Sequence, residues 1–283
     1  MRTVDLHVHS NYSDGTCTPA ELVQKALDSG VCAMALTDHD TVDGVPHILS
    51  AAAEIPDAPE IVPGTELSVG FRDRDIHIVG LFIDHTYKDL KEMSAVMIAR
   101  RDARNEEMAE RFRKDGIPIT MEELTDGNPD TVVTRAHFSR LLIKYGVVKN
   151  TAEAFNGYLN PEAPYYVPRE YYTREQGIQM ILAAGGIPIL AHPLLYNLSE
   201  KEIRDLLKEL KGYGLMGVEV KYSTYSSQDE AFAMRLAKEF ELLPSGGSDF
   251  HGSNKPTISL GTGMGNLAVP EEYLEAIRAA KSN

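Results

Sequence analysis

Two histidines, His7 and His9, stand one residue apart at the end of the apolar run 4–8, just before the polar turn 11–15. Side chains two positions apart in a strand point to the same face, so these imidazoles would form a chelating pair. A single pair of this kind is more often two histidines on the polar face of an edge strand than a metal site. Here an apolar strand ending in His, Asp or Glu recurs at His39, Glu66, His77, His192, Asp249 and His251. The recurrence predicts a metal centre.

The elements that position these residues alternate between strand and helix patterns, which indicates an α/β fold. We expect strands at 4–10, 33–37, 60–67, 75–83, 187–191, 216–221 and 242–245, with helices between most of them. The gap 68–74 is too short for a crossover helix, so the third and fourth strands should form an antiparallel hairpin. A closed or nearly closed barrel brings the strand ends together. Every candidate lies at such an end except His77, which lies near the start of its strand.

The alternation stops between residues 88 and 174, where helices at 95–114, 135–145 and 151–156 and a Pro/Tyr-rich loop are expected. We interpret residues 1–90 and 175–283 as the barrel domain and residues 91–174 as a small helical insertion that covers the substrate. Arg100, Arg101 and Arg104 are interleaved with acidic residues, which is typical of a solvated helix.

Composition narrows the class of protein. The 283 residues are 43% hydrophobic and carry a formal net charge of −14, which disfavours binding to duplex DNA. No apolar run approaches the length of a membrane span, and no signal peptide is evident, so a cytoplasmic location is expected. Two cysteines cannot form a disulfide framework. The glycines at 246 and 247 are expected to let the backbone approach the metal centre closely.

The whole candidate set is His7, His9, Asp14, His39, Glu66, His77, His192, Asp249 and His251. Nine ligands are too many for one ion, because a mononuclear catalytic site needs about three protein ligands and an open position. We therefore expect two to three divalent ions, with a carboxylate such as Glu66 bridging. Imidazole and carboxylate ligands without thiolate suit Zn²⁺, Mn²⁺ or Fe²⁺.

Six motifs in this order resemble the PHP (polymerase and histidinol phosphatase) family: 5–10 (DLHVHS) with 13–15 (SDG), 37–40 (TDHD), 64–66 (GTE), 77–80 (HIVG), 191–193 (AHP) and 248–251 (SDFH). The resemblance implies a distorted (β/α)7 barrel, a trinuclear metal site and phosphoesterase activity. It assigns His7, His9, Glu66 and Asp249 to one ion, and Glu66, His77 and His192 to a second. Asp14, His39 and His251 would hold a third.

One departure from the family pattern bears on the metal. Several relatives, including histidinol-phosphate phosphatases, have histidine where this chain has Asp14. A carboxylate makes the third position more oxygen-rich, which favours Mn²⁺.

The insertion resembles the PHP branch that acts on nucleotides, through Thr134, Arg135 and His137 and the tyrosines near 158–166. That resemblance implies hydrolysis of the 3′-phosphate of 3′,5′-bisphosphonucleosides such as phosphoadenosine phosphate. A hydroxide bridging two ions would attack phosphorus. We expect Arg135 and His137 to contact the second phosphate, since a guanidinium matches phosphate with two parallel donors.

Two alternatives remain open. The first is a 5′-3′ exonuclease acting on short 5′-phosphorylated RNA, which releases mononucleotides instead of inorganic phosphate. The second is a non-catalytic, metal-stabilised module that docks on a partner, against which the complete ligand set argues. Histidinol phosphate is disfavoured as a substrate by Asp14 and by the insertion.

Overall fold

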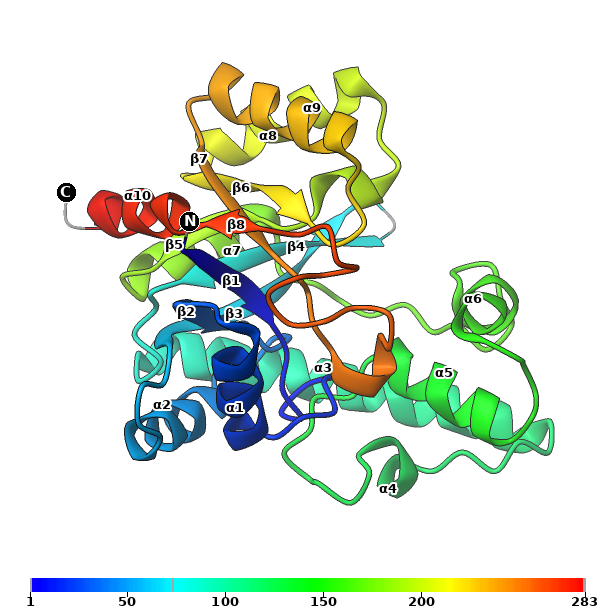
Figure 1. The fold of residues 1–283 in the computed structure, drawn as a ribbon. Coiled ribbons are helices and arrows are strands. Elements are labelled where there is room, and N and C mark those ends of the chain that lie inside the picture. The colour runs from blue at the N-terminus through cyan, green and yellow to red at the C-terminus, as the bar shows by residue number, and fades with distance from the viewer. Residues whose placement is uncertain (1, 73, 282–283) are drawn as a thin grey trace.

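The computed structural model describes residues 2–72 and 74–281 and shows an α/β barrel, as expected from the sequence (Figure 1). Its strands are β1 (Thr3–Val8), β2 (Ala33–Leu36), β3 (Glu60–Phe71), β4 (Arg74–Leu81), β5 (Ile187–Leu190), β6 (Gly217–Tyr222), β7 (Leu243–Gly247) and β8 (Val269–Pro270). Its α-helices are α1 (Pro19–Ser29), α2 (Gly44–Glu54), α3 (Lys88–Lys114), α4 (Met121–Leu124), α5 (Arg135–Lys144), α6 (Thr151–Ala154), α7 (Arg174–Ala183), α8 (Glu200–Gly212), α9 (Ser227–Glu239) and α10 (Glu271–Lys281). No described helix has both the length and the apolar character needed to cross a membrane.

The sheet has the order β7-β6-β5-β4-β3-β2-β1-β8 and is mainly parallel. It closes where β1 meets the end of β7. There the Asp249 amide donates to the His7 carbonyl at 2.8 Å, and the His9 amide donates to the Phe250 carbonyl at 3.0 Å. Gly247 lies against this junction, and a Cβ on it would lie 2.4 Å from the His7 Cβ. Glycine at this position therefore allows the barrel to close beside the histidine pair.

The predicted hairpin between β3 and β4 is present and antiparallel, and β4 also runs antiparallel to β5. Ser68 pairs with His77 in this hairpin. The start of β4 consequently lies beside the later part of β3, at the end of the barrel where the parallel strands finish. This reversal explains why His77, alone among the strand candidates, lies near the beginning of its strand.

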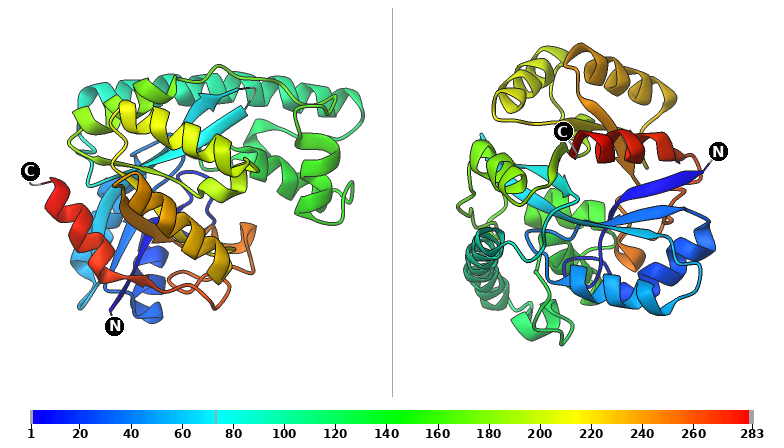
Figure 2. Two further views of the ribbon diagram at one scale, coloured as in Figure 1. Left: turned by 90° about the horizontal axis from the view of Figure 1, so that it is seen from above. Right: turned by 90° about the vertical axis from the view of Figure 1, so that its left-hand side faces the viewer.

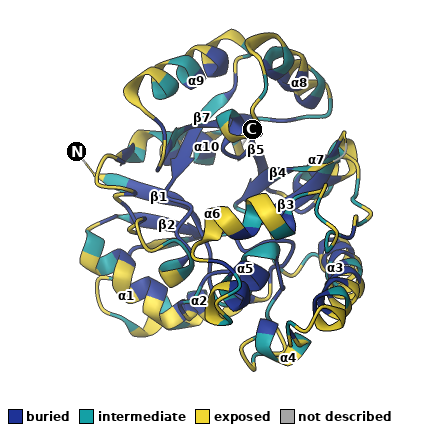
Figure 3. Cartoon of the chain, turned by 90° about the vertical axis from the view of Figure 1, so that its right-hand side faces the viewer, coloured by how far each residue is buried: buried dark blue, intermediate teal, exposed yellow. Residues whose placement is uncertain are grey.

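Local sequence signals define both ends of α1. The Thr18 hydroxyl accepts from the Glu21 amide, and the Glu21 carboxylate accepts from the Thr18 amide, so the two residues form a capping box in front of Pro19. Gly30 ends α1 with φ of 76°, a left-handed conformation that glycine adopts without strain. Most strand residues are buried, and the helices are exposed on their outer faces (Figure 3).

Helix α3 begins at residue 88, earlier than the predicted start at 95. Its first half contributes Leu90, Met93 and Met97 to the main barrel core. Its second half contributes Met108 and Phe112 to a separate apolar cluster formed by residues 108–167. The helix runs beside the barrel and continues into the group of helices between β4 and α7 (Figure 2). One long helix therefore joins two cores.

The sequence prediction missed β8 and α10. Strand β8 pairs antiparallel with β1, and Leu274 and Ile277 of α10 pack with buried residues of the sheet. Arg278 of α10 forms an ion pair of 2.7 Å with Glu60, the first residue of β3. Helix α10 thus covers the barrel end opposite α5 and α6, which lie in front of the strands in Figure 3.

Candidate metal centre and phosphate-binding cavity

The structure brings the nine predicted ligands to one end of the barrel. They come from β1, β3 and β4, from the turn after β1, and from the segments directly after β2, β5 and β7. Eight of them are buried and His77 is partly buried. Three groups of donor atoms within this set are close enough to hold a metal ion: first His7, His9 and Glu66; second His39, Glu66 and His77; and third His9, Asp14, His39 and His251.

The first group is arranged around His7 of β1 and His9, which directly follows that strand. The Nε2 atoms of His7 and His9 are 3.1 Å apart, and each lies 3.3 Å from Oε2 of Glu66. Oδ1 of Asp249 lies 3.3 Å from Nε2 of His9 and 3.7 Å from Nε2 of His7. Four nitrogen and oxygen atoms, from β1, β3 and the segments directly after β1 and β7, therefore converge on one point.

Glu66 also faces a second group with its other oxygen. Oε1 of Glu66 lies 3.0 Å from Nδ1 of His77 and 3.1 Å from Nε2 of His192. The backbone around Glu66 is held to the segment after β2, because its amide donates to Asp38 and its carbonyl accepts from Asp40. A carboxylate that presents one oxygen to each of two groups has the geometry expected of a bridging ligand.

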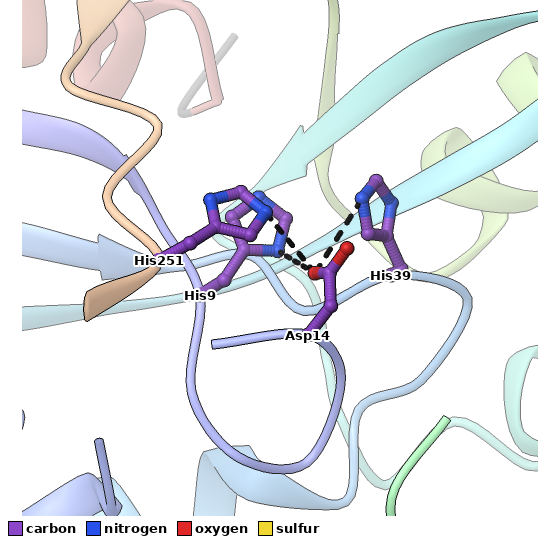
Figure 4. Close-up of side chains that lie close together, drawn as sticks. All are labelled: His9, Asp14, His39 and His251. Carbon is purple, nitrogen blue, oxygen red and sulfur yellow. Dashed lines mark ion pairs between the residues drawn. The ribbon is translucent and has the colours of Figure 1, made fainter. Parts of the chain in front are cut away.

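The third group surrounds Asp14 (Figure 4). Oδ1 of Asp14 lies 3.0 Å from Nε2 of His251 and 3.8 Å from both Nε2 of His39 and Nδ1 of His9. Although this oxygen is buried, it makes no hydrogen bond with the described residues. A buried carboxylate oxygen that faces imidazoles and lacks a donor matches the environment of a metal ligand.

Charge within the cluster is paired between acids and bases. Burial opposes the charged form of His9 and His77, but carboxylates raise the pKa of His9 to about 9 and that of His77 to about 10. Burial also opposes ionisation of Glu66 and Asp14, yet neighbouring histidines hold both pKa values well below the usual range. Carboxylates that draw protons onto imidazoles at neutral pH attract cations, so the donor set fits divalent metal ions.

Glu219 of β6 was not predicted as part of the site. Its Oε1 lies 2.8 Å from Nδ1 of His7, and its Oε2 accepts from the His192 amide at 2.6 Å. It therefore orients His7, whose Nε2 faces the first group, and fixes the backbone at His192. The available signal was an acid between Val218 and Val220 in an otherwise apolar strand.

Asp38 and Asp40 flank His39 in the sequence and are not among the nine candidate ligands. Asp38 instead accepts from the Ser10 amide and from the Ser10 and Ser13 hydroxyls at 2.6–2.8 Å, so it holds the turn that carries Asp14. Asp40 has φ of 56° and pairs with arginines, as described below. Left-handed backbone also occurs at His192 and Asp249, which places strained residues around the cluster.

A cavity of about 310 Å³ opens onto the cluster. The cluster side of its wall includes Asp14, His39, Glu66, His77, His192, Asp249 and His251. The remaining wall includes Arg101, Arg104, Arg135, Arg169, Asp75, Phe155, Tyr171, Leu195 and Lys255. Imidazoles with carboxylates, and a group of arginines, therefore share one cavity.

The prediction that Arg101 and Arg104 are solvated is wrong. They are only 5% and 7% exposed, because this part of α3 faces the barrel. Arg101 Nε donates to Asp40 at 2.7 Å, and Arg169 lies 3.3 Å from the same carboxylate. Arg100 points elsewhere and pairs with Glu170. Acidic neighbours along the sequence concealed the fact that two of the three arginines face inward.

Arg104 makes neither a hydrogen bond nor an ion pair with any residue that the structure describes. Burial, together with Arg101, Arg169 and Arg135, lowers the pKa of Arg104 to about 9. The guanidinium is still charged at neutral pH, yet no anion compensates it. Buried charges are normally paired, so this side chain is suited to an anion that enters the cavity.

The two predicted substrate contacts lie in different surroundings. Arg135, half-buried, lines the cavity, and its guanidinium lies 5.8 Å from the centre of the Phe155 ring. His137 is buried, and its Nδ1 accepts from the Thr134 amide at 3.0 Å. Burial lowers the pKa of His137 to about 4, so it is neutral at pH 7. The structure thus places His137 behind Thr134 and outside the cavity wall.

Comparison with known proteins gives consistent relatives. The chain is 36% identical to the 5′-3′ exoribonuclease Rnm of Escherichia coli, over 91% of this chain and 87% of that protein. It is 39% identical to a 5′-3′ exoribonuclease of Haemophilus influenzae, over 87% of this chain and 89% of that protein. It is 34% identical to a 3′,5′-nucleoside bisphosphate phosphatase of Chromobacterium violaceum, over 89% and 88% of the two chains.

Solved structures agree with these relatives. A protein from Chromobacterium violaceum described as an amidohydrolase, solved with bound sulfate and no metal, superposes with a TM-score of 0.87 at 30% identity, over 98% of this chain and 96% of that one. A putative metal-dependent phosphoesterase from Bifidobacterium adolescentis gives a TM-score of 0.86 at 28% identity, over 98% and 96%. Residues 5–237 match the PHP domain, and the chain therefore belongs to the PHP family of metal-dependent phosphoesterases.

Proposed function

We propose that this protein hydrolyses a phosphate ester of a small nucleotide that carries a second phosphate, with the 3′-phosphate of a 3′,5′-bisphosphonucleoside as the first candidate. The observation that carries the proposal is the shared cavity. One part of its wall is the imidazole–carboxylate cluster, and another is the arginine group with the unpartnered Arg104. A cluster that would bind one phosphate through its metal ions and an arginine group that would bind another suit a ligand with two phosphates.

In this proposal the cluster holds two or three Mn²⁺ ions. His7, His9, Glu66 and Asp249 hold one ion, and Glu66, His77 and His192 hold another. Asp14, His39 and His251 hold the third. Bound divalent ions supply Lewis-acid activation of water and of the phosphoryl group. Manganese is favoured because carboxylate oxygens supplement the imidazoles in each set.

The residues of the chain bind and orient the substrate. Arg104 and Arg135 donate to the second phosphate, and Arg135 is the predicted contact that lines the cavity. Asp40 holds Arg101 and Arg169 in place beside them, so this region presents donors of fixed orientation. Phe155 and Leu195 provide apolar wall area for the nucleoside. His137 acts indirectly, through Thr134.

The test is phosphate release from 3′,5′-bisphosphoadenosine by manganese-loaded protein. Arg135→Ala should lower kcat/KM for this substrate by about 10- to 100-fold, the value of one charge-assisted phosphate contact. It should leave hydrolysis of adenosine 3′-monophosphate unchanged, because that substrate has no second phosphate. Arg140→Ala is the matched control, since Arg140 lies on the same helix and pairs with Asp126. Absence of phosphate release from every nucleotide tested would overturn the proposal.

The relatives from Escherichia coli and Haemophilus influenzae favour a second candidate, 5′-3′ exonuclease action on short 5′-phosphorylated RNA. The same arginine group would then bind the 5′-phosphate, while the following phosphodiester lies at the cluster. An end-labelled oligoribonucleotide ladder separates the two candidates: stepwise release of mononucleotides supports the exonuclease, and an unchanged ladder with release of phosphate from the bisphosphonucleoside supports the phosphatase.

A further inference from the structure

The turn that carries Asp14 is held by residues between α4 and α5, outside the barrel. The Val132 amide donates to the Tyr12 carbonyl at 3.0 Å. The Thr131 hydroxyl donates to the Asn11 carbonyl at 2.9 Å. The segment 131–134 therefore lies along the turn and fixes its backbone.

Thr134 extends this contact to the ligand itself. Its hydroxyl donates to Oδ2 of Asp14 at 2.8 Å, and both side chains are buried. The two oxygens of a carboxylate share one plane, so a hydrogen bond to Oδ2 fixes the direction of Oδ1. Oδ1 is the atom that faces His251, His39 and His9.

The hydroxyl of Thr134 is committed to this direction by the start of α5. Its oxygen accepts from the Ala136 amide at 3.1 Å, which leaves the hydroxyl proton for Asp14. His137 stands where a capping box usually has Glu or Gln, and its Nδ1 accepts from the Thr134 amide. Nδ1 can accept this hydrogen bond because the buried imidazole of His137 is neutral.

Helix α3 supports the same segment from the other side. The fully buried Asn105 donates from Nδ2 to the carbonyl of Val133 at 3.0 Å. Asn105 directly follows Arg104, which faces the cavity. The helix that carries the anion-binding arginine therefore also holds the residue next to Thr134.

We infer that Thr134 is a positioning residue for the ion at Asp14, and that the helical segment completes the third metal site from outside the barrel. The inference rests on the metal centre of the proposed function and concerns metal affinity, which is measured without substrate. A lost hydrogen-bond partner of a metal ligand weakens metal binding by about 10- to 100-fold.

The experiment compares Thr134→Val, Thr134→Ser and Thr173→Val. Valine keeps the shape of threonine and removes the hydroxyl, whereas serine retains it. Thr173→Val is the matched control, because Thr173 is also an N-cap in a capping box, at the exposed start of α7. Both valine variants lose a cap worth about 1 kcal/mol. Only Thr134→Val also loses the contact with Asp14.

Mn²⁺ stoichiometry is measured by elemental analysis, and dissociation constants by competition with a chromophoric chelator. Thr134→Val should bind one ion about 10- to 100-fold more weakly and the other ions normally. Thr134→Ser and Thr173→Val should match the unmodified protein. Thermal unfolding of each variant confirms that the comparison is made on folded protein.

Unchanged affinities in Thr134→Val would overturn the inference. Equal weakening in Thr173→Val would also overturn it, because loss of a cap would then explain the result, and so would weakening in Thr134→Ser. If the unmodified protein binds the ions but hydrolyses no phosphate ester, the proposed function fails and the inference about Thr134 is still decided by these affinities.

Discussion

Replacing Arg104 with methionine should stabilise the free protein and weaken its activity on substrates with a second phosphate. Arg104 is 7% exposed and has no partner among the described residues. Methionine retains much of the aliphatic stem and favours helix. The substitution removes a buried, uncompensated charge, and it also removes the donor that we propose for the phosphate. The two effects have opposite signs.

The stability effect follows from the pKa. Burial and the neighbouring arginines lower the pKa of Arg104 from the usual range of arginine to about 9 on folding. At about 1.4 kcal/mol per pKa unit this corresponds to an upper bound of about 5 kcal/mol for the charged form. The real gain is smaller than this upper bound, because relaxation of the surroundings already lowers the penalty of the charge and because methionine packs less well than arginine. We therefore expect about 1–3 kcal/mol of net stabilisation.

The direction in which the stability gained by Arg104→Met changes with pH also follows from the lowered pKa. A base whose pKa is lowered by folding binds more protons when unfolded, so its penalty applies in full below pH 9 and disappears as the pH rises from there to the usual pKa range of arginine. The advantage of Arg104→Met should therefore be complete at pH 7. For activity, loss of one charge-assisted contact of about 1.5–3 kcal/mol lowers kcat/KM by about 10- to 150-fold.

Urea unfolding at pH 7 measures the first effect, and kinetics with 3′,5′-bisphosphoadenosine and adenosine 3′-monophosphate measure the second. Arg100→Met is the matched control on the same helix, because Arg100 is partly exposed and pairs with Glu170; its stability should change by less than about 0.5 kcal/mol. The reasoning is refuted if Arg104→Met is less stable than the unmodified protein, or if both substrates lose activity equally.

Three further outcomes are expected at the metal centre. Glu219→Gln should weaken binding of the ion at His7 by about 10- to 100-fold in chelator competition. Glu219 accepts from both Nδ1 of His7 and the His192 amide, and glutamine has only one acceptor oxygen for these two donors. Unchanged affinity would contradict this role. Adding Mn²⁺ to metal-free protein at pH 7 should release protons, because the pKa values of His9 and His77 are raised to about 9 and 10. Calorimetry in buffers of different ionisation enthalpy counts the released protons. Zero release would exclude the charge pairing described between the carboxylates and these histidines. Asp14→His should shift preference from Mn²⁺ towards Zn²⁺ when both compete, and an unaltered ratio would argue against Asp14 as a ligand.

The sequence was sufficient to predict the barrel and the set of residues at its open end. Ligands at strand ends are visible because an apolar strand that stops at His or Asp is a local pattern, as at His39 and Asp249. The antiparallel hairpin followed from the length of the gap at 68–74. Each of these features can be recognised from residues that are close together in the sequence.

Features that depend on contacts between distant segments were missed. Arg104 resembles a solvated residue until α3 is placed against the barrel. Glu219 becomes a partner of His7 only when β6 and β1 belong to one closed sheet. Thr134 meets Asp14 across 120 positions of sequence. Strand β8 is two residues long and leaves almost no periodicity to detect.

The continuity of the chain from α3 to the start of α7 has a consequence for how such enzymes diversify. All nine residues of the cluster lie outside this stretch, while Arg101, Arg104, Arg135 and Arg169 lie within it. Under the proposed function, mutation or recombination confined to one contiguous piece of gene can therefore alter what the enzyme recognises and leave its hydrolytic chemistry intact. Thr134 restricts which replacement segments would be tolerated, because an exchanged segment must still supply a hydroxyl to Asp14.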